Sequence, residues 1–119
     1  MKKDYTHKKV LIIQGPNMNL LGYRLKETKT RLTLDKLNAH LRKTAKEIEL
    51  ELIIVQTNDE SRAVAELQKL RNKIYSVLLY PGPWQQSGYV IKDTLDILSI
   101  PCITVSVGEK EGILKGIKN

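Results

Sequence analysis

The sequence predicts an α/β three-layer sandwich, in which helices cover both faces of a parallel sheet of about four strands. Four short apolar segments alternate with three segments of helical periodicity, an order typical of parallel strands joined by helical crossovers. The apolar segments are continuous rather than alternating in polarity, which indicates strands that are buried on both faces. With 119 residues, the chain is long enough for a single domain, residues 1–119, with one core.

The first half of the chain supplies two strands, the first helix and the start of the second helix. Residues 10–13 are the first expected strand. A helix follows, because apolar residues recur at three- and four-residue spacing from Leu34 to Ile48 and Thr33 is placed to cap its start. Residues 52–55 are the second strand, and Thr57-Asn58-Asp59-Glu60 has the form of a capping box that opens the second helix.

The second half supplies the remaining strands and helix. Residues 74–79 are the third expected strand, ended by Tyr80-Pro81-Gly82-Pro83. Apolar residues between Val90 and Leu98 predict a third helix, and residues 102–107 are the fourth strand. Residues 1–8 are expected to form an N-terminal arm, and residues 108–119 a short basic tail with too few apolar residues to predict an element.

Composition narrows the class of protein. The net charge of +7 arises from 20 Lys and Arg against 13 Asp and Glu, but the bases are dispersed and match no nucleic-acid-binding motif, so nucleic acid is a disfavoured partner. Cys102 is the only cysteine, which excludes an internal disulfide and a cysteine-based zinc site. The sequence shows neither a signal peptide nor an apolar run of the ~20 residues that a membrane helix needs, so we expect a cytoplasmic protein without a membrane partner.

The segment GPNMNLLGYR, from Gly15 to Arg24, follows the first strand and is the strongest candidate for a ligand loop. Ligands bind at the carboxyl ends of parallel strands. Glycine permits a tight turn there, the Asn17 amide can contact a bound group, and the Arg24 guanidinium matches a carboxylate or phosphate. The alternative is an ordinary turn followed by a solvated arginine.

GPNMNLLGYR also resembles the motif GPN-L-NLLG-x-R of the type II 3-dehydroquinate dehydratases (type II dehydroquinases). The resemblance spans about residues 9–107 and continues through these segments: Thr33-Leu34, Gln56-Thr57-Asn58-Asp59-Glu60, Tyr80-Pro81-Gly82, Lys92-Asp93-Thr94-Leu95 and Ile100-Pro101. It implies a flavodoxin-like fold and a homo-oligomer. It also implies a lyase of the shikimate pathway and aromatic amino acid biosynthesis, which eliminates water from 3-dehydroquinate through an enolate, without a metal or cofactor.

The family's proton-transfer residues carry over unevenly. Asn17 matches the asparagine that holds an enolate-stabilising water, and Arg24 matches the arginine that supports a tyrosinate base. The position of that tyrosine is occupied by Lys29, and the position of the general-acid histidine by Ser106. The resemblance thus retains two supporting residues and neither proton-transfer residue.

Substrate-binding positions differ as well. The resemblance assigns such positions to Tyr80, Gln86 and Thr104, where the family has asparagine, histidine and glutamate, and Asp93 matches an aspartate that reaches a neighbouring subunit's site. The start of the second helix near Asn58 is expected to complete an anion-binding rim. The basic and amide members of that rim are Asn17, Arg24, Lys26, Lys29 and Arg31. An aromatic cluster is expected at the end of the third strand, from Tyr80, Trp84 and Tyr89. We expect it to fill the vacated pocket, and the alternative is that it forms an interface.

Three functional hypotheses follow. A positioned acid or base contributes roughly 100- to 10,000-fold to a rate, so the first is a pseudoenzyme with weak or no dehydratase activity that still binds a small carboxylate such as 3-dehydroquinate. The second is an active dehydratase in which a desolvated Lys29 beside Arg24 replaces the tyrosine. The third is a basic interaction module for nucleic acid or an acidic partner.

Overall fold

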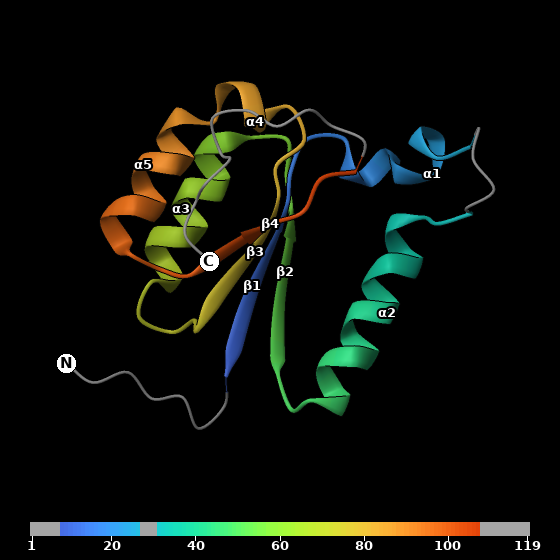
Figure 1. Cartoon of the computed structure of the whole chain (residues 1–119), viewed down its shortest axis with the longest axis horizontal. Coiled ribbons are helices and arrows are strands. Elements are labelled where there is room, and N and C mark those ends of the chain that lie inside the picture. Colours follow the sequence, from blue (N-terminus) through green and yellow to red (C-terminus); the bar gives the residue numbers. More distant parts are fainter. Residues whose placement is uncertain (1–7, 27–30, 108–119) are drawn as a thin grey trace.

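Four parallel strands form the sheet at the centre of the computed structural model, which describes residues 8–26 and 31–107 (Figure 1). The strands are β1 (Lys9–Gln14), β2 (Glu51–Gln56), β3 (Ser76–Tyr80) and β4 (Cys102–Thr104). Their order in the sheet is β2-β1-β3-β4, and all three pairings are parallel. The predicted fold class and element order are therefore confirmed.

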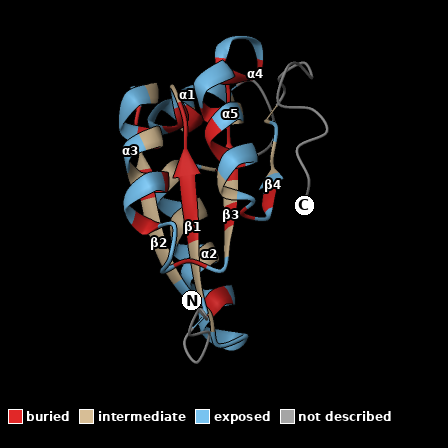
Figure 2. Cartoon of the chain, turned by 90° about the vertical axis from the view of Figure 1, so that its left-hand side faces the viewer, coloured by how far each residue is buried: buried red, intermediate tan, exposed pale blue. Residues whose placement is uncertain are grey.

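Helices lie on both faces of the sheet (Figures 1 and 2). On one face α3 (Glu60–Leu70) packs beside α5 (Tyr89–Leu98), and on the other lies α2 (Leu34–Glu47). Three short helices sit at the carboxyl ends of the strands: the 3₁₀ helix η1 (Met18–Leu20), α1 (Leu21–Arg24) and α4 (Trp84–Ser87). Among the described residues, no helix combines the length and apolarity that a membrane span requires.

The face beneath α3 and α5 holds the larger apolar core. Leu11, Ile13, Val77 and Leu79 point to this side from β1 and β3, and each is at most 2% exposed. They pack against Leu67, Ile91, Leu95 and other residues of the two helices. Burying side chains of this size contributes about 1.5–3 kcal/mol each, so this face carries much of the stability.

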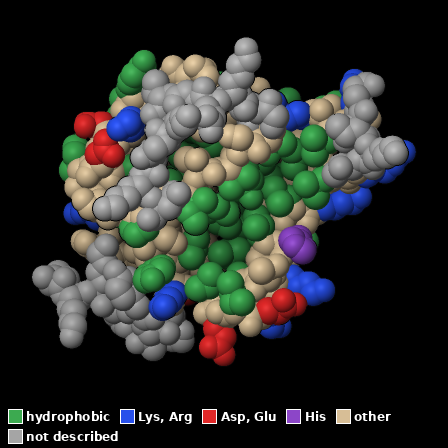
Figure 3. All heavy atoms as spheres, in the orientation of Figure 1, with side chains coloured by type: hydrophobic (Ala, Val, Ile, Leu, Met, Phe, Trp, Pro, Cys, Tyr) green, Lys and Arg blue, Asp and Glu red, His purple; other side chains and the backbone are tan. Residues whose placement is uncertain are grey.

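The face beneath α2 is covered less completely. Ile12 is 1% exposed, but Leu78 beside it on β3 is half-buried, and Ile103, the partner of Leu78 on β4, is 53% exposed. Figure 3 shows an apolar surface on this side of the molecule, next to the His side chain and the bases that flank it. Helices therefore cover both faces, as expected, and the cover is more complete on the first face than on the second.

Several element boundaries differ from the sequence prediction. The third strand begins at Ser76 rather than residue 74, because the Ile74 N–H still donates to Leu70 O at the end of α3. The fourth strand ends at Thr104 rather than residue 107. Thr33 caps α2 as predicted, since its side chain accepts from Lys36 N at 3.3 Å. The expected arm (apart from Lys8) and tail lie outside the described residues.

Candidate functional site

Gly15 joins the loops that follow β1 and β3. Its N–H donates to Tyr80 O at 2.8 Å, and Thr57 N–H donates to Gln14 O at 2.9 Å, so the loops after three strands are tied together by main-chain hydrogen bonds. A Cβ added at Gly15 would lie 2.7 Å from Tyr80 O and 2.9 Å from Pro81 O. Only glycine fits at this position.

Asn17 has a left-handed backbone conformation, with φ of 69°, which is uncommon for residues other than glycine. Its N–H donates to the Asn58 side-chain oxygen Oδ1 at 3.1 Å. Gln56 Nε2 donates to that same Oδ1 at 3.3 Å and to Gly15 O at 3.2 Å. The structure thus brings Asn17 and Asn58 together, with Gln56 between the two loops.

The basic residues of the predicted rim are exposed where the structure describes them. Arg24 ends α1, which directly follows η1, and its side chain is exposed. Lys26 and Arg31 are exposed as well. Lys29, the candidate replacement for the family's tyrosine, lies outside the described residues.

Tyr80, the last residue of β3, points toward α2 and packs against Ile12, Met18 and Leu21. It is 6% exposed, and desolvation by burial raises the pKa of its hydroxyl above the ordinary value. Its phenol therefore stays neutral at physiological pH and does not offer a tyrosinate base.

The predicted aromatic cluster is wrong as a group. Trp84 belongs to the apolar core beneath α3 and α5, whereas Tyr80 belongs to the cluster on the other face of the sheet. Tyr89 is 65% exposed on α5. The cause is that Tyr80 ends β3 and faces α2, whereas Trp84 and Tyr89 follow the turn after the strand and belong to α4 and α5.

The residues on the β4 side of the sheet are less closely connected. Thr104 ends β4 and is half-buried, while Ser106 is exposed two residues later. Gln86 is exposed on α4. No hydrogen bond between side chains joins these three to Asn17 among the contacts of the described residues.

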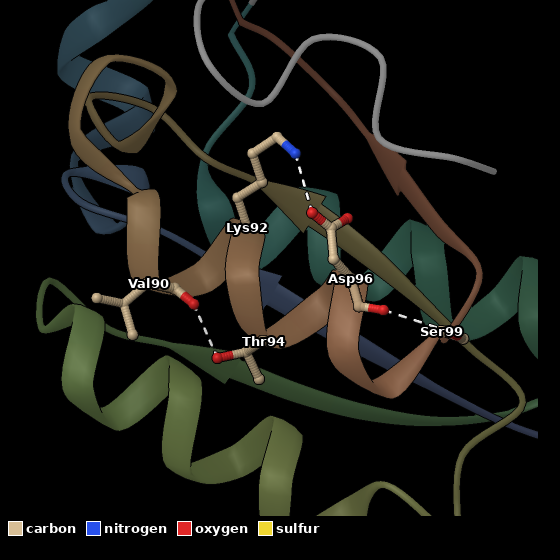
Figure 4. Close-up of polar contacts among 5 residues, drawn as sticks. All are labelled: Val90, Lys92, Thr94, Asp96 and Ser99. Atoms are coloured by element: carbon tan, nitrogen blue, oxygen red, sulfur yellow. Dashed lines mark hydrogen bonds and ion pairs between the residues drawn. The ribbon is translucent and has the colours of Figure 1, made fainter.

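Asp93 lies on α5, across the sheet from α1 and α2, and its side chain is exposed. Its neighbours on the helix, Lys92 and Asp96, form an ion pair at 3.0 Å (Figure 4). Thr94 Oγ1 donates to Val90 O at 2.8 Å within the same helix. Asp93 therefore lies away from the loop that carries Asn17.

The start of α3 differs from the expected anion-binding helix terminus. The N-cap is Asp59, which accepts from Ser61 N at 2.9 Å, whereas Thr57 Oγ1 accepts from Asp59 N. Thr57 was thus the wrong cap. With Asp59 and Glu60 at the terminus, two carboxylates already occupy the region of positive potential, which opposes binding of a further anion there.

Two glutamines that end strands, Gln14 and the half-buried Gln56, were given no role in the sequence analysis. Gln14 is fully buried, and its Nε2 donates to Asn38 Oδ1 of α2 at 2.6 Å, but its Oε1 has no partner in the structure. Gln56 ends β2 in the same row of the sheet. A glutamine at the last position of each of the first two strands was the available signal. Within the described residues, no group of three or more His, Cys, Asp and Glu could hold a metal ion.

Comparisons with known proteins agree with the fold. The family model "Dehydroquinase class II" matches residues 8–111. The 3-dehydroquinate dehydratase of Endomicrobium trichonymphae is 33% identical over 100 residues, which cover 84% of this chain and 70% of that protein. That of Caldicellulosiruptor saccharolyticus is 34% identical over 101 residues, with the same coverage of both proteins.

A solved structure shows the same fold. The type II dehydroquinase from Butyrivibrio crossotus superposes with a TM-score of 0.86 at 27% identity, over 96% of this chain and 86% of that one. The family match covers more than half of the chain, and the two dehydratases exceed 30% identity over most of its length. The chain belongs to the class II dehydroquinase family.

Proposed function

We propose that this chain binds a small carboxylate ligand of the 3-dehydroquinate type and has weak or no dehydratase activity. Tyr80 carries the loss of activity in this proposal. It occupies the position that the family resemblance assigns to a substrate-binding asparagine, yet its ring is 6% exposed and packs against Met18 and Leu21 of the first loop. A buried phenol in place of an amide removes a polar contact and fills space beneath the loop.

The groups that support binding are separate from those that move protons. Asn17 offers an exposed amide, and the Arg24 guanidinium can pair with a carboxylate through two parallel hydrogen bonds. Gln86, Thr104 and Ser106 are the other candidate contacts around the ligand. Asp93 is the candidate contact to a neighbouring subunit, so a homo-oligomer is part of the proposal.

The elimination of water needs a base for the proton beside the ketone and an acid for the departing hydroxyl. Ser106 stands at the general-acid position, and a serine hydroxyl does not titrate near neutral pH. Tyr80 cannot serve as the base, because burial raises its pKa. Each missing group is worth roughly 100- to 10,000-fold, so the combined loss is at least about 10,000-fold.

The test is a dehydratase assay that follows the absorbance of the conjugated product, with the Butyrivibrio crossotus enzyme assayed in parallel. We expect turnover at least about 10,000-fold slower than that control. Turnover within about tenfold of the control would overturn the proposed loss of activity. In that case Lys29→Ala decides whether this lysine acts as the base.

Ligand binding is tested separately by thermal unfolding with quinate. A ligand at ~100 times its dissociation constant stabilises the native state by about 2.7 kcal/mol, which appears as a rise in Tm. We expect the rise for the natural chain and its loss in Arg24→Ala. No rise at any soluble quinate concentration would refute the binding part of the proposal.

A further inference from the structure

We propose that Gln56 is a positioning residue that holds Asn17 in its left-handed conformation and thereby presents the Asn17 amide to the ligand. The link to the ligand rests on the proposed function, whereas the hold on Asn17 does not. The observation is a chain of three hydrogen bonds that runs from Gly15 O through Gln56 and Asn58 to the Asn17 N–H.

Both N–H groups of the Gln56 amide have a partner. One donates to Gly15 O at 3.2 Å and the other to Asn58 Oδ1 at 3.3 Å. Because Gly15 O is a carbonyl and can only accept, the orientation of the Gln56 amide is fixed by its partners. The N–H that Gln56 donates to Asn58 Oδ1 keeps this oxygen turned toward the first loop, where it also accepts from Asn17 N–H. Gln56 therefore orients the Asn58 side chain and, through its second N–H, binds the Gly15 carbonyl.

The two ends of this series of hydrogen bonds lie on either side of the turn between β1 and η1. Gly15 O is the first carbonyl of the turn and Asn17 N the last amide before η1. The left-handed region costs most residues roughly 1–2 kcal/mol, and asparagine is one of the few residues other than glycine that adopt it with less strain. Asn17 is exposed, so hydrogen bonds rather than burial in the core hold it. Its N–H donates to Asn58, while Met18 N–H donates to Gly15 O at 3.2 Å and Leu20 N–H to Asn17 O at 2.9 Å.

The contacts of Gln56 lie outside both apolar clusters of the molecule. Its partners are in the loops after β1 and β2, and two of the three hydrogen bonds are exposed. Loss of its donors should therefore change the local conformation at Asn17 and leave the sheet intact. That difference separates a positioning role from a role in overall stability.

The experiment replaces the amide nitrogen while keeping the shape of the side chain. In Gln56→Glu both donors are lost, and a carboxylate oxygen faces two acceptors; Gln56→Met removes the donors without adding charge. Gln68→Glu on the exposed side of α3 is the control for the charge change. The measurements are amide hydrogen exchange by NMR and quinate affinity by calorimetry.

We expect the Asn17 amide to exchange at least about tenfold faster in both Gln56 variants, with exchange at Leu11 and Ile13 unchanged. Quinate affinity should fall at least about tenfold in these variants and stay unchanged in Gln68→Glu. Wild-type exchange at Asn17 in both variants would overturn the proposal, and so would faster exchange with unaltered affinity. If the natural chain binds no quinate, the proposed function fails, while the exchange rates still decide whether Gln56 holds Asn17.

Discussion

At the scale of single residues, Gly15 is the position where the ligand loop and the sheet constrain each other most closely. A methyl group there would sit 2.7 Å from Tyr80 O and 2.9 Å from Pro81 O, and neither backbone oxygen can move without disturbing the loop after β3. We expect Gly15→Ala to lower the free energy of unfolding by about 2–4 kcal/mol, from overpacking together with a weakened hydrogen bond to Tyr80. Urea denaturation measures this loss.

Gly22→Ala is the matched control for that substitution. Gly22 lies within α1, and its added Cβ would meet only a side-chain methyl group, Thr33 Cγ2 at 3.3 Å, and no backbone atom. Alanine is favoured over glycine in a helix by up to ~1 kcal/mol, so we expect a change of no more than about 1 kcal/mol in either direction. Equal effects of the two substitutions would show that Gly15 is not specially constrained.

A glycine in the turn after the first strand was predictable from the local sequence, although the structure requires it for a different reason, the close approach of Tyr80 O and Pro81 O. The roles of Asn58 and Tyr80 were not predictable. Asn58 was predicted to contact a ligand, but its Oδ1 accepts from Asn17 and Gln56, partners up to 41 positions away. Tyr80 is buried because Met18 and Leu21 fold over it, which no local pattern reveals.

At the scale of elements, α5 begins without a side-chain cap of its own, since Gly88 precedes it. Glu60 of α3 supplies an acceptor instead, with its Oε2 3.3 Å from Ile91 N. We expect Glu60→Ala to lower the free energy of unfolding by about 1 kcal/mol, through loss of this cap and of a negative charge near two helix starts. Urea denaturation and faster amide exchange at Ile91 are the measurements.

Glu66→Ala removes the same charge from the middle of α3, where it faces no helix start, and we expect an effect below about 0.5 kcal/mol. An equal loss in both variants would contradict the capping role of Glu60.

This contact also explains why the boundary of α3 was mispredicted. The capping-box pattern assumes that the glutamate reaches back to its own helix. Here Glu60 reaches across to α5, and Asp59 becomes the cap. The helices themselves follow from apolar periodicity, whereas the choice among nearby capping residues depends on a second helix.

At the scale of the whole molecule, two buried acids make the stability of the fold sensitive to alkaline pH. Burial raises the pKa of the Cys102 thiol to about 12 and raises the pKa of the Tyr80 hydroxyl as well. Above about pH 9 the unfolded chain loses the thiol proton while the folded chain keeps it, so the free energy of unfolding falls by about 1.4 kcal/mol per pH unit until about pH 12. Below pH 8 the thiol contributes no pH dependence.

The measurement is urea denaturation at pH 8 and pH 10 for the natural chain and for Cys102→Ala. We expect the drop between these pH values to be smaller in the variant by about 1.4 kcal/mol. Cys102→Ala also leaves a cavity, so only the difference between the two pH values counts. An identical drop in both proteins would show that the thiol ionises in the folded chain.

The architecture as a whole was the most predictable level. Continuous apolar strands and intervening helical periodicity predict a parallel sheet between helices, and the sheet order agrees with that class. The incomplete cover over Leu78 and Ile103 was not predicted, because an apolar strand residue has the same appearance in sequence whether or not a helix lies above it.

The hydrogen bonds from Gly15 to Tyr80 and from Thr57 to Gln14 have a consequence for how such chains are recognised in genomes. They continue the ladder of the sheet beyond its strands, so a descendant that had abandoned its substrate altogether would still need them in order to fold. Selection for solubility and folding alone can therefore preserve the glycine at position 15. The glycine is therefore evidence of common ancestry, whereas catalytic activity is shown only by measured turnover.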